Sequence, residues 1–194
     1  MRYRLAGSLV LLALLGACES APPAPPREFD GAAAFRYVET QVAFGPRVPG
    51  TPGHQKMAAW LDSLGHATAD SVFIQDWVNV TKKGEKLSLH NVMMRFNPAA
   101  QERILFLTHW DTRPIAEKSV NPEDRNKPID GANDGASGVA VLLGMADALK
   151  KPPPTIGVDL LFVDGEDYGS FEDSTATLLG ARYYAKNHAP GPKP

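Results

Sequence analysis

The segment IGVDLLFVDGED, residues 156–167, joins an almost unbroken apolar run to a cluster of acidic residues. Such a run is typical of a strand that is covered on both faces. The segment RILFLTHWD, residues 103–111, has the same pattern, and a helical stretch from about Ser137 to Leu149 lies between the two runs. A strand, a helix and a second strand at this spacing predict a βαβ unit with parallel strands, and hence an α/β fold.

The residues before this unit predict two helices. Asp30 is of a residue type that caps helix N-termini, so a first helix is expected to run from there to about Ala43. Thr51 followed by Pro52 is typical of the start of a second helix, which Gly65 is expected to end. The apolar face of the first helix is predicted to contain Phe35, Val38 and Val42.

Two further patterns complete the outline of the domain. The segments SVFIQDWVNV and KLSLHNVMMRF are rich in strand-forming residues and are joined by the polar turn TKKGE, so they predict an antiparallel hairpin. A last helix is expected in LLGARYYAKNH, residues 178–188. The 194 residues, 43% of them hydrophobic, with a net charge of -2, describe a globular domain, and the scattered basic residues exclude a nucleic-acid-binding stripe.

The N-terminus has the pattern of an export signal. MRYR supplies positive charge, and the apolar stretch that follows is shorter than the roughly 20 residues that a membrane-spanning helix needs. The stretch ends in LLGAC, which resembles a bacterial lipobox, so Cys18 is the predicted lipidation site; the alternative is an ordinary signal peptide with a chance cysteine. We therefore expect an exported, membrane-anchored cell-envelope lipoprotein, with a signal peptide in residues 1–18, a Pro/Ala-rich tether in 19–29 and a domain in 30–194.

Polar side chains gather where the two central strands are expected to end. His109 and Asp111 follow the first strand, Asp134 lies in the loop DGANDGASG, and Glu166 and Asp167 follow the second strand. In open α/β sheets, active sites lie beyond the carboxyl ends of the strands. These five residues are therefore the candidate site residues.

Zinc accepts carboxylate and imidazole ligands, and an acid beside the metal that is not a ligand can transfer protons. The residue pattern alone leaves other roles open. Asp134 could cap the following helix, the acids at 166 and 167 could belong to a solvated loop, and His109 could be a structural histidine. Because the chain contains a single cysteine, a zinc site made of thiolates is excluded.

Four motifs in this order resemble the zinc-dependent glutaminyl cyclases (glutaminyl-peptide cyclotransferases) and the related zinc aminopeptidases. They are FGPRVPGTPGH, THWDTRP, GANDGASGVAVLL and FVDGEDYG followed by LLGARYYA, and the likeness extends from about Phe44 to the last helix. The resemblance implies a three-layer α/β/α fold with a twisted mixed, mostly parallel sheet.

The resemblance also implies roles for the candidate residues. Asp134 and Asp167 match zinc ligands, and Glu166 matches the general base or acid. His109 matches a ligand of the second metal in the two-metal aminopeptidases, whereas in the one-zinc cyclases it belongs to a hydrogen-bond network. Asp111 is expected to orient His109 through a hydrogen bond.

Family members carry a further acid and a zinc-binding histidine in their C-terminal third, and this chain ends before both. The zinc shell is therefore expected to lack its third ligand, and the chain is expected to be a truncated product. His188 falls where the family has a surface loop, so it is a poor substitute for the missing ligand.

Three functions are open, and the resemblance implies the first two. The first is a cyclotransferase that converts the N-terminal glutamine of peptides to pyroglutamate with release of ammonia. The second is an aminopeptidase that acts on peptide or protein N-termini, against which the Asp at position 167 counts, because aminopeptidases usually have Glu there. The third is an inactive membrane-tethered fragment.

Overall fold

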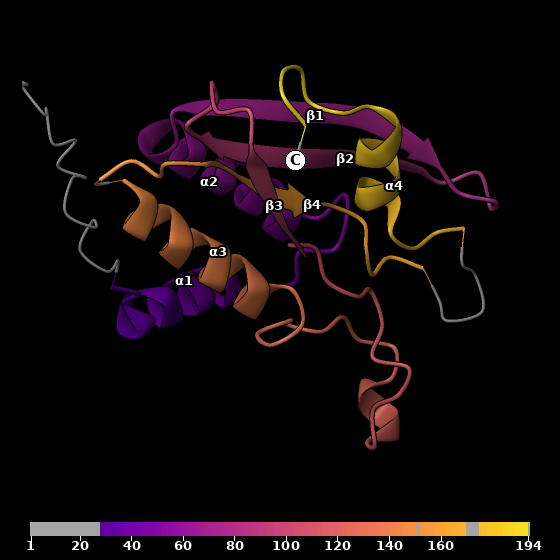
Figure 1. Cartoon of the computed structure of the whole chain (residues 1–194). Coiled ribbons are helices and arrows are strands. Elements are labelled where there is room, and N and C mark those ends of the chain that lie inside the picture. The colour runs from indigo at the N-terminus through magenta and orange to yellow at the C-terminus, as the bar shows by residue number, and fades with distance from the viewer. Residues whose placement is uncertain (1–27, 151, 170–174, 194) are drawn as a thin grey trace, which may run out of the picture.

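The computed structural model describes residues 28–150, 152–169 and 175–193. The predicted signal sequence, Cys18 and nearly all of the tether lie outside these residues. In the described part of the chain, no helix is both long enough and apolar enough to span a bilayer. The elements, in chain order, are α1 (Gly31–Ala43), α2 (Pro52–Thr68), β1 (Ser71–Val80), β2 (Lys86–Phe96), β3 (Arg103–His109), the 3-10 helix η1 (Pro122–Asp124), α3 (Ala136–Leu149), β4 (Gly157–Val163) and α4 (Leu179–Lys186) (Figure 1).

The four strands form one mixed sheet in the order β1-β2-β4-β3. β3 and β4 are parallel neighbours, from the pair Arg103 and Gly157 to the pair His109 and Val163, so the predicted βαβ unit is confirmed. The predicted hairpin is also confirmed, because β1 and β2 pair antiparallel. The expectation of a mostly parallel sheet does not hold for the described strands, because β2 also pairs antiparallel with β4.

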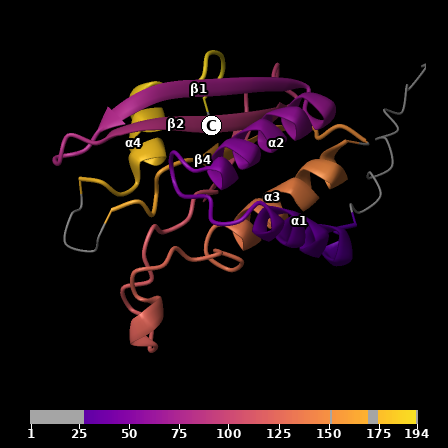
Figure 2. The same cartoon turned by 180° about the vertical axis from the view of Figure 1, so that it is seen from behind.

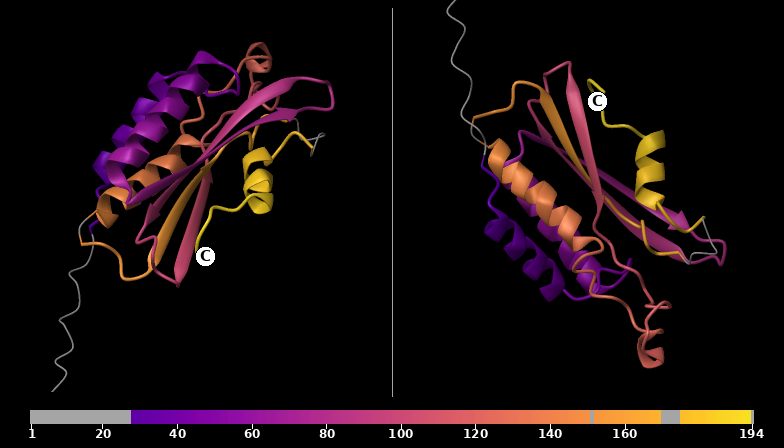
Figure 3. Two further views of the ribbon diagram at one scale, coloured as in Figure 1. Left: turned by 90° about the horizontal axis from the view of Figure 1, so that it is seen from above. Right: turned by 60° about the horizontal axis from the view of Figure 1, so that its bottom comes forward.

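The helices lie on both faces of this sheet. α1, α2 and α3 cover one face and α4 lies on the other, so the three-layer arrangement is confirmed (Figure 3). The main core fills the space between the sheet and the three-helix face. Its buried residues include Met57, Leu61, Val92, Phe96, Trp110, Leu143, Leu160 and Phe162.

The N-termini of α1 and α2 follow the local sequence. Asp30 Oδ1 accepts a hydrogen bond of 2.9 Å from the Ala33 N–H, and the Thr51 hydroxyl accepts one from the His54 N–H, as the cap patterns predict. The predicted end of α2 at Gly65 is wrong, since the helix continues to Thr68. A Cβ at Gly65 would lie 3.2 Å from Val72 Cγ2, so this glycine permits close packing of the helix on the hairpin.

Two predictions of burial are wrong. Phe35 is 62% exposed, because α1 turns Ala34 and Gln41 inward and Gln41 Nε2 donates to the Ala136 carbonyl oxygen. β3 is not covered on both faces, and Leu107 is 49% exposed, because β3 is the edge strand of the described sheet. The long connection from β3 to α3 contains η1 and projects away from the sheet (Figures 1 and 2).

His90 joins the hairpin to α2. Its Nε2 lies 2.8 Å from Asp62 Oδ1 and its Nδ1 lies 2.7 Å from Asp76 Oδ1. Burial favours the neutral imidazole, but the hydrogen bonds and charges of the two carboxylates outweigh burial and raise the His90 pKa above 6.5. The charged imidazole is therefore more stable in the folded protein than in the unfolded chain.

We expect the stabilisation by His90 to be complete below about pH 6.5 and to be lost as the pH rises through the raised pKa of the folded state. In urea unfolding between about pH 6 and about pH 9, the free-energy difference between the wild type and His90→Gln should shrink as the pH rises. His188→Gln, in the exposed C-terminal segment, is the control. A difference that is constant with pH would contradict the prediction.

Candidate active site

A pocket of about 600 Å³ opens at the carboxyl end of the parallel pair β3 and β4. Four of the five residues predicted from the sequence line it together: His109, Asp134, Glu166 and Asp167. The fifth, Asp111, is fully buried beside the pocket. The pocket is also lined by Leu107, Thr108, Arg113, Val163, Leu178 and Ala181.

Asp111 holds the acidic turn that follows β4. Its Oδ1 accepts a hydrogen bond from the Glu166 N–H and its Oδ2 accepts one from the Asp167 N–H, both 3.0 Å long. His109 Nδ1 lies 3.5 Å from Asp111 Oδ1, at ion-pair distance, and makes no hydrogen bond within the described structure. Asp111 lies close enough to pair with the His109 ring, but its two short hydrogen bonds go to the turn, so its role in orienting His109 stays a prediction.

The carbonyl groups of the same turn are bound from the other side. The oxygens of Asp164, Gly165 and Glu166 accept hydrogen bonds of 2.8 to 3.0 Å from the N–H groups of residues 180, 179 and 178. Gly165 has a φ of 65°, which glycine adopts without strain. We call residues 164–167 the acidic turn; hydrogen bonds on both of its sides fix its backbone.

Asp134 lies in the glycine-rich loop before α3. Its side chain is 62% exposed, and its Oδ1 lies 2.9 Å from His109 Nε2. The alternative in which Asp134 caps the helix is wrong, because the N-cap is Gly135 and no side chain makes a cap bond there. Gly131 has a φ of 60°, and a Cβ on it would overlap Thr112, so the loop requires glycine at this position.

Arg113, in the loop that follows β3, holds the side chain of Asp167. Asp167 Oδ1 accepts a 2.5 Å hydrogen bond from Arg113 Nη1, and Arg113 also binds the Glu117 carboxylate. Its Oδ2 is buried and has no hydrogen-bond partner in the described part of the chain. The alternative of a solvated loop does not hold for Asp167, whose side chain is 12% exposed.

The charges in the pocket shift the pKa values of these groups. Burial raises the pKa of Glu166, and the nearby positive charge of His109 opposes this shift. Burial also raises the pKa of Asp167, opposed by Arg113. Burial alone would lower the pKa of His109, but the carboxylates of Asp111, Glu166 and Asp134 raise it to about 9.

The donor set fits part of a zinc shell. Asp167 presents a buried oxygen without a partner, Asp134 presents an exposed carboxylate, and both line one pocket. Carboxylate oxygens are ligands that zinc accepts. Within residues 28–150, 152–169 and 175–193, no group of three or more His, Cys, Asp or Glu side chains is placed to hold a metal ion.

Replacing Asp111 by asparagine should weaken metal binding. The carboxylate accepts hydrogen bonds from the N–H groups of residues 166 and 167, but an asparagine NH₂ group would face one of these donors and could not accept its bond. The acidic turn should therefore shift. We expect zinc affinity, measured by calorimetry, to fall by about 10-fold to 100-fold. The control Asp124→Asn changes a half-exposed acid in η1, far from the pocket lining, and should leave the affinity unchanged. Unchanged affinity in Asp111→Asn would contradict this account.

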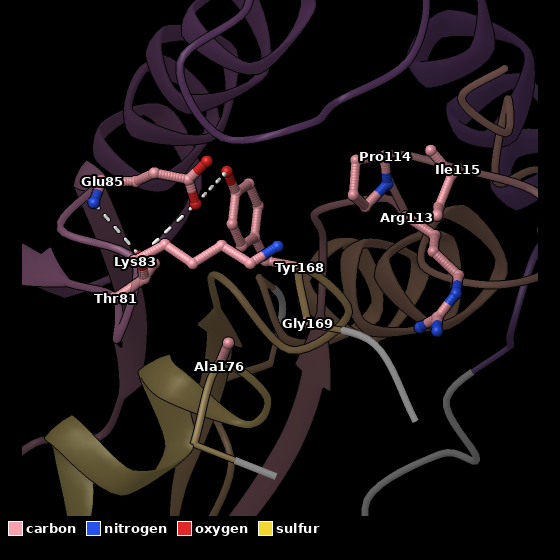
Figure 4. A pocket seen from close by; sticks show the side chains of 9 residues that line it. All are labelled: Thr81, Lys83, Glu85, Arg113, Pro114, Ile115, Tyr168, Gly169 and Ala176. Carbon is pink, nitrogen blue, oxygen red and sulfur yellow. Dashed lines mark hydrogen bonds between the residues drawn. The ribbon is translucent and has the colours of Figure 1, made fainter. Parts of the chain in front are cut away.

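A smaller pocket of about 230 Å³ adjoins the site (Figure 4). Arg113 lines both pockets, and Tyr168, the residue after Asp167, lines the smaller one. The hairpin turn closes its far side, and the Tyr168 hydroxyl donates to Glu85 Oε2 at 3.5 Å. The remaining lining residues are Thr81, Lys83, Pro114, Ile115, Gly169 and Ala176.

Two arginines that build the site, Arg47 and Arg113, were not predicted from the sequence. Arg47 is fully buried, and its guanidinium donates to the carbonyl oxygens of Trp110, Asp130 and Gly131. Arg113 binds Asp167. Both arginines lie inside the family motifs FGPRVPGTPGH and THWDTRP, and their place in these motifs was the available signal.

A mixed α/β fold with an acid-lined pocket at the carboxyl ends of parallel strands is typical of α/β enzymes. The profile of peptidase family M28 matches residues 91–193, more than half of the chain, and the chain belongs to this family. It is similar to the glutaminyl cyclase of Tannerella forsythia, at 40% identity and a TM-score of 0.80, over 85% of this chain and 59% of that one.

Two further relatives show the range of the family. A Zn-dependent exopeptidase from Parabacteroides distasonis is 37% identical, with a TM-score of 0.80, over 84% of this chain and 58% of its own. The glutaminyl-peptide cyclotransferase of Bos taurus is 26% identical over 76% of this chain and 42% of its own length. The chain therefore spans less than two thirds of these relatives. The likeness supports an enzyme of glutaminyl cyclase or peptidase type.

Proposed function

We propose that this chain acts as a zinc-dependent glutaminyl-peptide cyclotransferase. The observation that carries the proposal is the presence of Glu166, with a raised pKa, in one pocket with Asp134 and Asp167. The likeness to the Tannerella forsythia glutaminyl cyclase supports the reaction. The proposal assigns a single zinc ion to Asp134 and Asp167.

When bound, zinc would act as a Lewis acid on the γ-carboxamide carbonyl of an N-terminal glutamine. Glu166 accepts a proton from the α-amine of the substrate, and the amine nitrogen attacks the γ-carbonyl carbon to close the ring. Glu166 then returns the proton to the carboxamide nitrogen as its C–N bond breaks, so ammonia leaves and pyroglutamate remains. The raised pKa of Glu166 brings it closer to neutral pH, which suits both proton transfers.

The second candidate function is an aminopeptidase with two metal ions, in which a water molecule replaces the amine as nucleophile. The position of His109 favours it, because Nε2 lies 2.9 Å from Asp134 Oδ1 at the pocket wall. The likeness to the Parabacteroides distasonis exopeptidase also supports it. In this candidate His109 is a ligand of the second metal.

One assay distinguishes the candidates. The protein is incubated with zinc and a peptide that begins with glutamine, and the products are weighed by mass spectrometry. Loss of ammonia from an intact peptide supports the cyclotransferase, and loss of the first residue supports the aminopeptidase. An unchanged peptide, with no zinc retained after dialysis, contradicts both and supports an inactive fragment.

We also propose that the protein is exported and anchored to a membrane through Cys18, with the N-termini of cell-envelope peptides as substrates. The support is the LLGAC pattern after a charged and apolar N-terminus. In a bacterial host, the wild type should incorporate a labelled fatty acid and sediment with membranes. Cys18→Ser should lose the label, and a labelled Cys18→Ser variant would contradict the assignment.

A further inference from the structure

His54, near the start of α2, is buried against the acidic turn although it lies 110 residues before it. Its side chain is 6% exposed, and its Nε2 lies 2.8 Å from Asp164 Oδ2. Because a carboxylate accepts hydrogen bonds, the imidazole is the donor. Its ring centroid lies 4.5 Å from that of the fully buried Trp110, so packing fixes its orientation.

Asp164, the first residue of the acidic turn, is fully buried and forms hydrogen bonds to three elements: α2, β2 and α4. Its Oδ2 also accepts a 2.8 Å bond from the His90 N–H of β2, and its own N–H donates to Asn91 Oδ1. Its carbonyl oxygen accepts the N–H of Gly180 in α4. A Cβ on Gly180 would lie 2.6 Å from the Asp164 backbone nitrogen, so α4 packs directly against the backbone of residue 164.

The carboxylate of Asp164 depends on few donors. Within the described residues, His54 is its one side-chain donor, and Oδ1 has no partner. A buried carboxylate that loses a donor is destabilised, so its side chain must rotate or admit water. Either change loosens the hold of α2 on residue 164, and Glu166 and Asp167 follow two and three residues later.

We propose that His54 is a positioning residue of the active site: its bond to Asp164 holds the acidic turn so that Glu166 and Asp167 face the pocket. The chemical role of these two acids rests on the proposed function, whereas the hold on the turn does not. His54 does not line the pocket and acts only through Asp164.

The test compares His54→Leu with His54→Gln. Leucine has no donor, whereas the glutamine amide reaches about as far as imidazole Nε2, and both variants lose the ring contact with Trp110. We measure hydrogen exchange of the backbone amides and binding of Co²⁺ by its visible absorption spectrum. His54→Leu should speed exchange at the amides of residues 166 and 167 and weaken Co²⁺ binding, each about tenfold. The amides of β1 should be unaffected, and His54→Gln should restore both properties.

Equal behaviour of the two variants, or wild-type behaviour of His54→Leu, would overturn the proposal. So would faster exchange throughout the chain, because it would indicate a purely structural role. If His54→Leu does not fold, His54→Asn replaces it, since the asparagine amide is too short to reach Asp164. If the wild type binds no Co²⁺, the proposed function fails, while the exchange measurement still tests the role of His54.

Discussion

Replacing Glu166 by glutamine is expected to slow the cyclisation of a glutamine peptide by about 100-fold or more, since proton transfer by a positioned acid contributes that much. Glutamine has the same shape, but its amide cannot take up the proton of the substrate amine. The backbone bond from the residue 166 N–H to Asp111 remains, so the acidic turn should keep its conformation. Ammonia release under steady-state conditions measures the rate.

Metal affinity separates this effect from a loss of the site. Glu166 is not an assigned ligand, so zinc binding by Glu166→Gln should stay within about threefold of the wild type. The control Glu123→Gln, at an exposed acid of η1, should leave both rate and affinity unchanged. A Glu166→Gln variant with full activity would show that another group transfers the proton.

Replacing Arg47 by lysine is expected to lower the free energy of unfolding by about 2 to 5 kcal/mol, because each buried carbonyl oxygen left without a donor costs about 1 to 3 kcal/mol. The Arg47 guanidinium donates to the carbonyl oxygens of residues 41, 110, 130 and 131, and its backbone N–H donates to Thr112 Oγ1. Lysine carries its charge on a single nitrogen and cannot reach these oxygens together. Burial lowers the pKa of Arg47 to about 10, so the group remains charged at neutral pH.

The measurement is urea unfolding followed by tryptophan fluorescence. Arg36→Lys, the same change on the exposed side of α1, should alter the free energy of unfolding by less than about 0.5 kcal/mol. A similarly small change in Arg47→Lys would mean that water or the lysine side chain donates to the carbonyl oxygens that lose the arginine. The loop with Asp134 begins at the carbonyls that Arg47 binds, so Arg47→Lys should also weaken metal binding.

Features that depend on neighbouring residues could be predicted from the sequence. The caps at Asp30 and Thr51 use contacts three residues apart, and the βαβ unit follows from runs of apolar residues. The candidate acids could be grouped because each follows a predicted strand or precedes the predicted helix. Their shared pocket is a consequence of the parallel pairing of β3 and β4.

Features that depend on distant contacts could not be predicted. Asp111 accepts hydrogen bonds from amides 55 and 56 residues away, and Arg47 donates one to a carbonyl oxygen 84 residues away. Phe35 is exposed because Gln41, a polar residue, occupies the inner side of α1 and bonds Ala136. Likewise, the apolar composition of β3 does not specify that the strand lies at an edge of the described sheet.

The hydrogen bonds on the two sides of the acidic turn are made by its backbone, and none of these bonds involves the Glu166 side chain. A library of variants randomised at position 166 should therefore be rich in folded proteins, even though most of its members lack the parent reactivity. Protein engineers would find in this turn a place where new chemistry can be screened without first restoring expression or solubility.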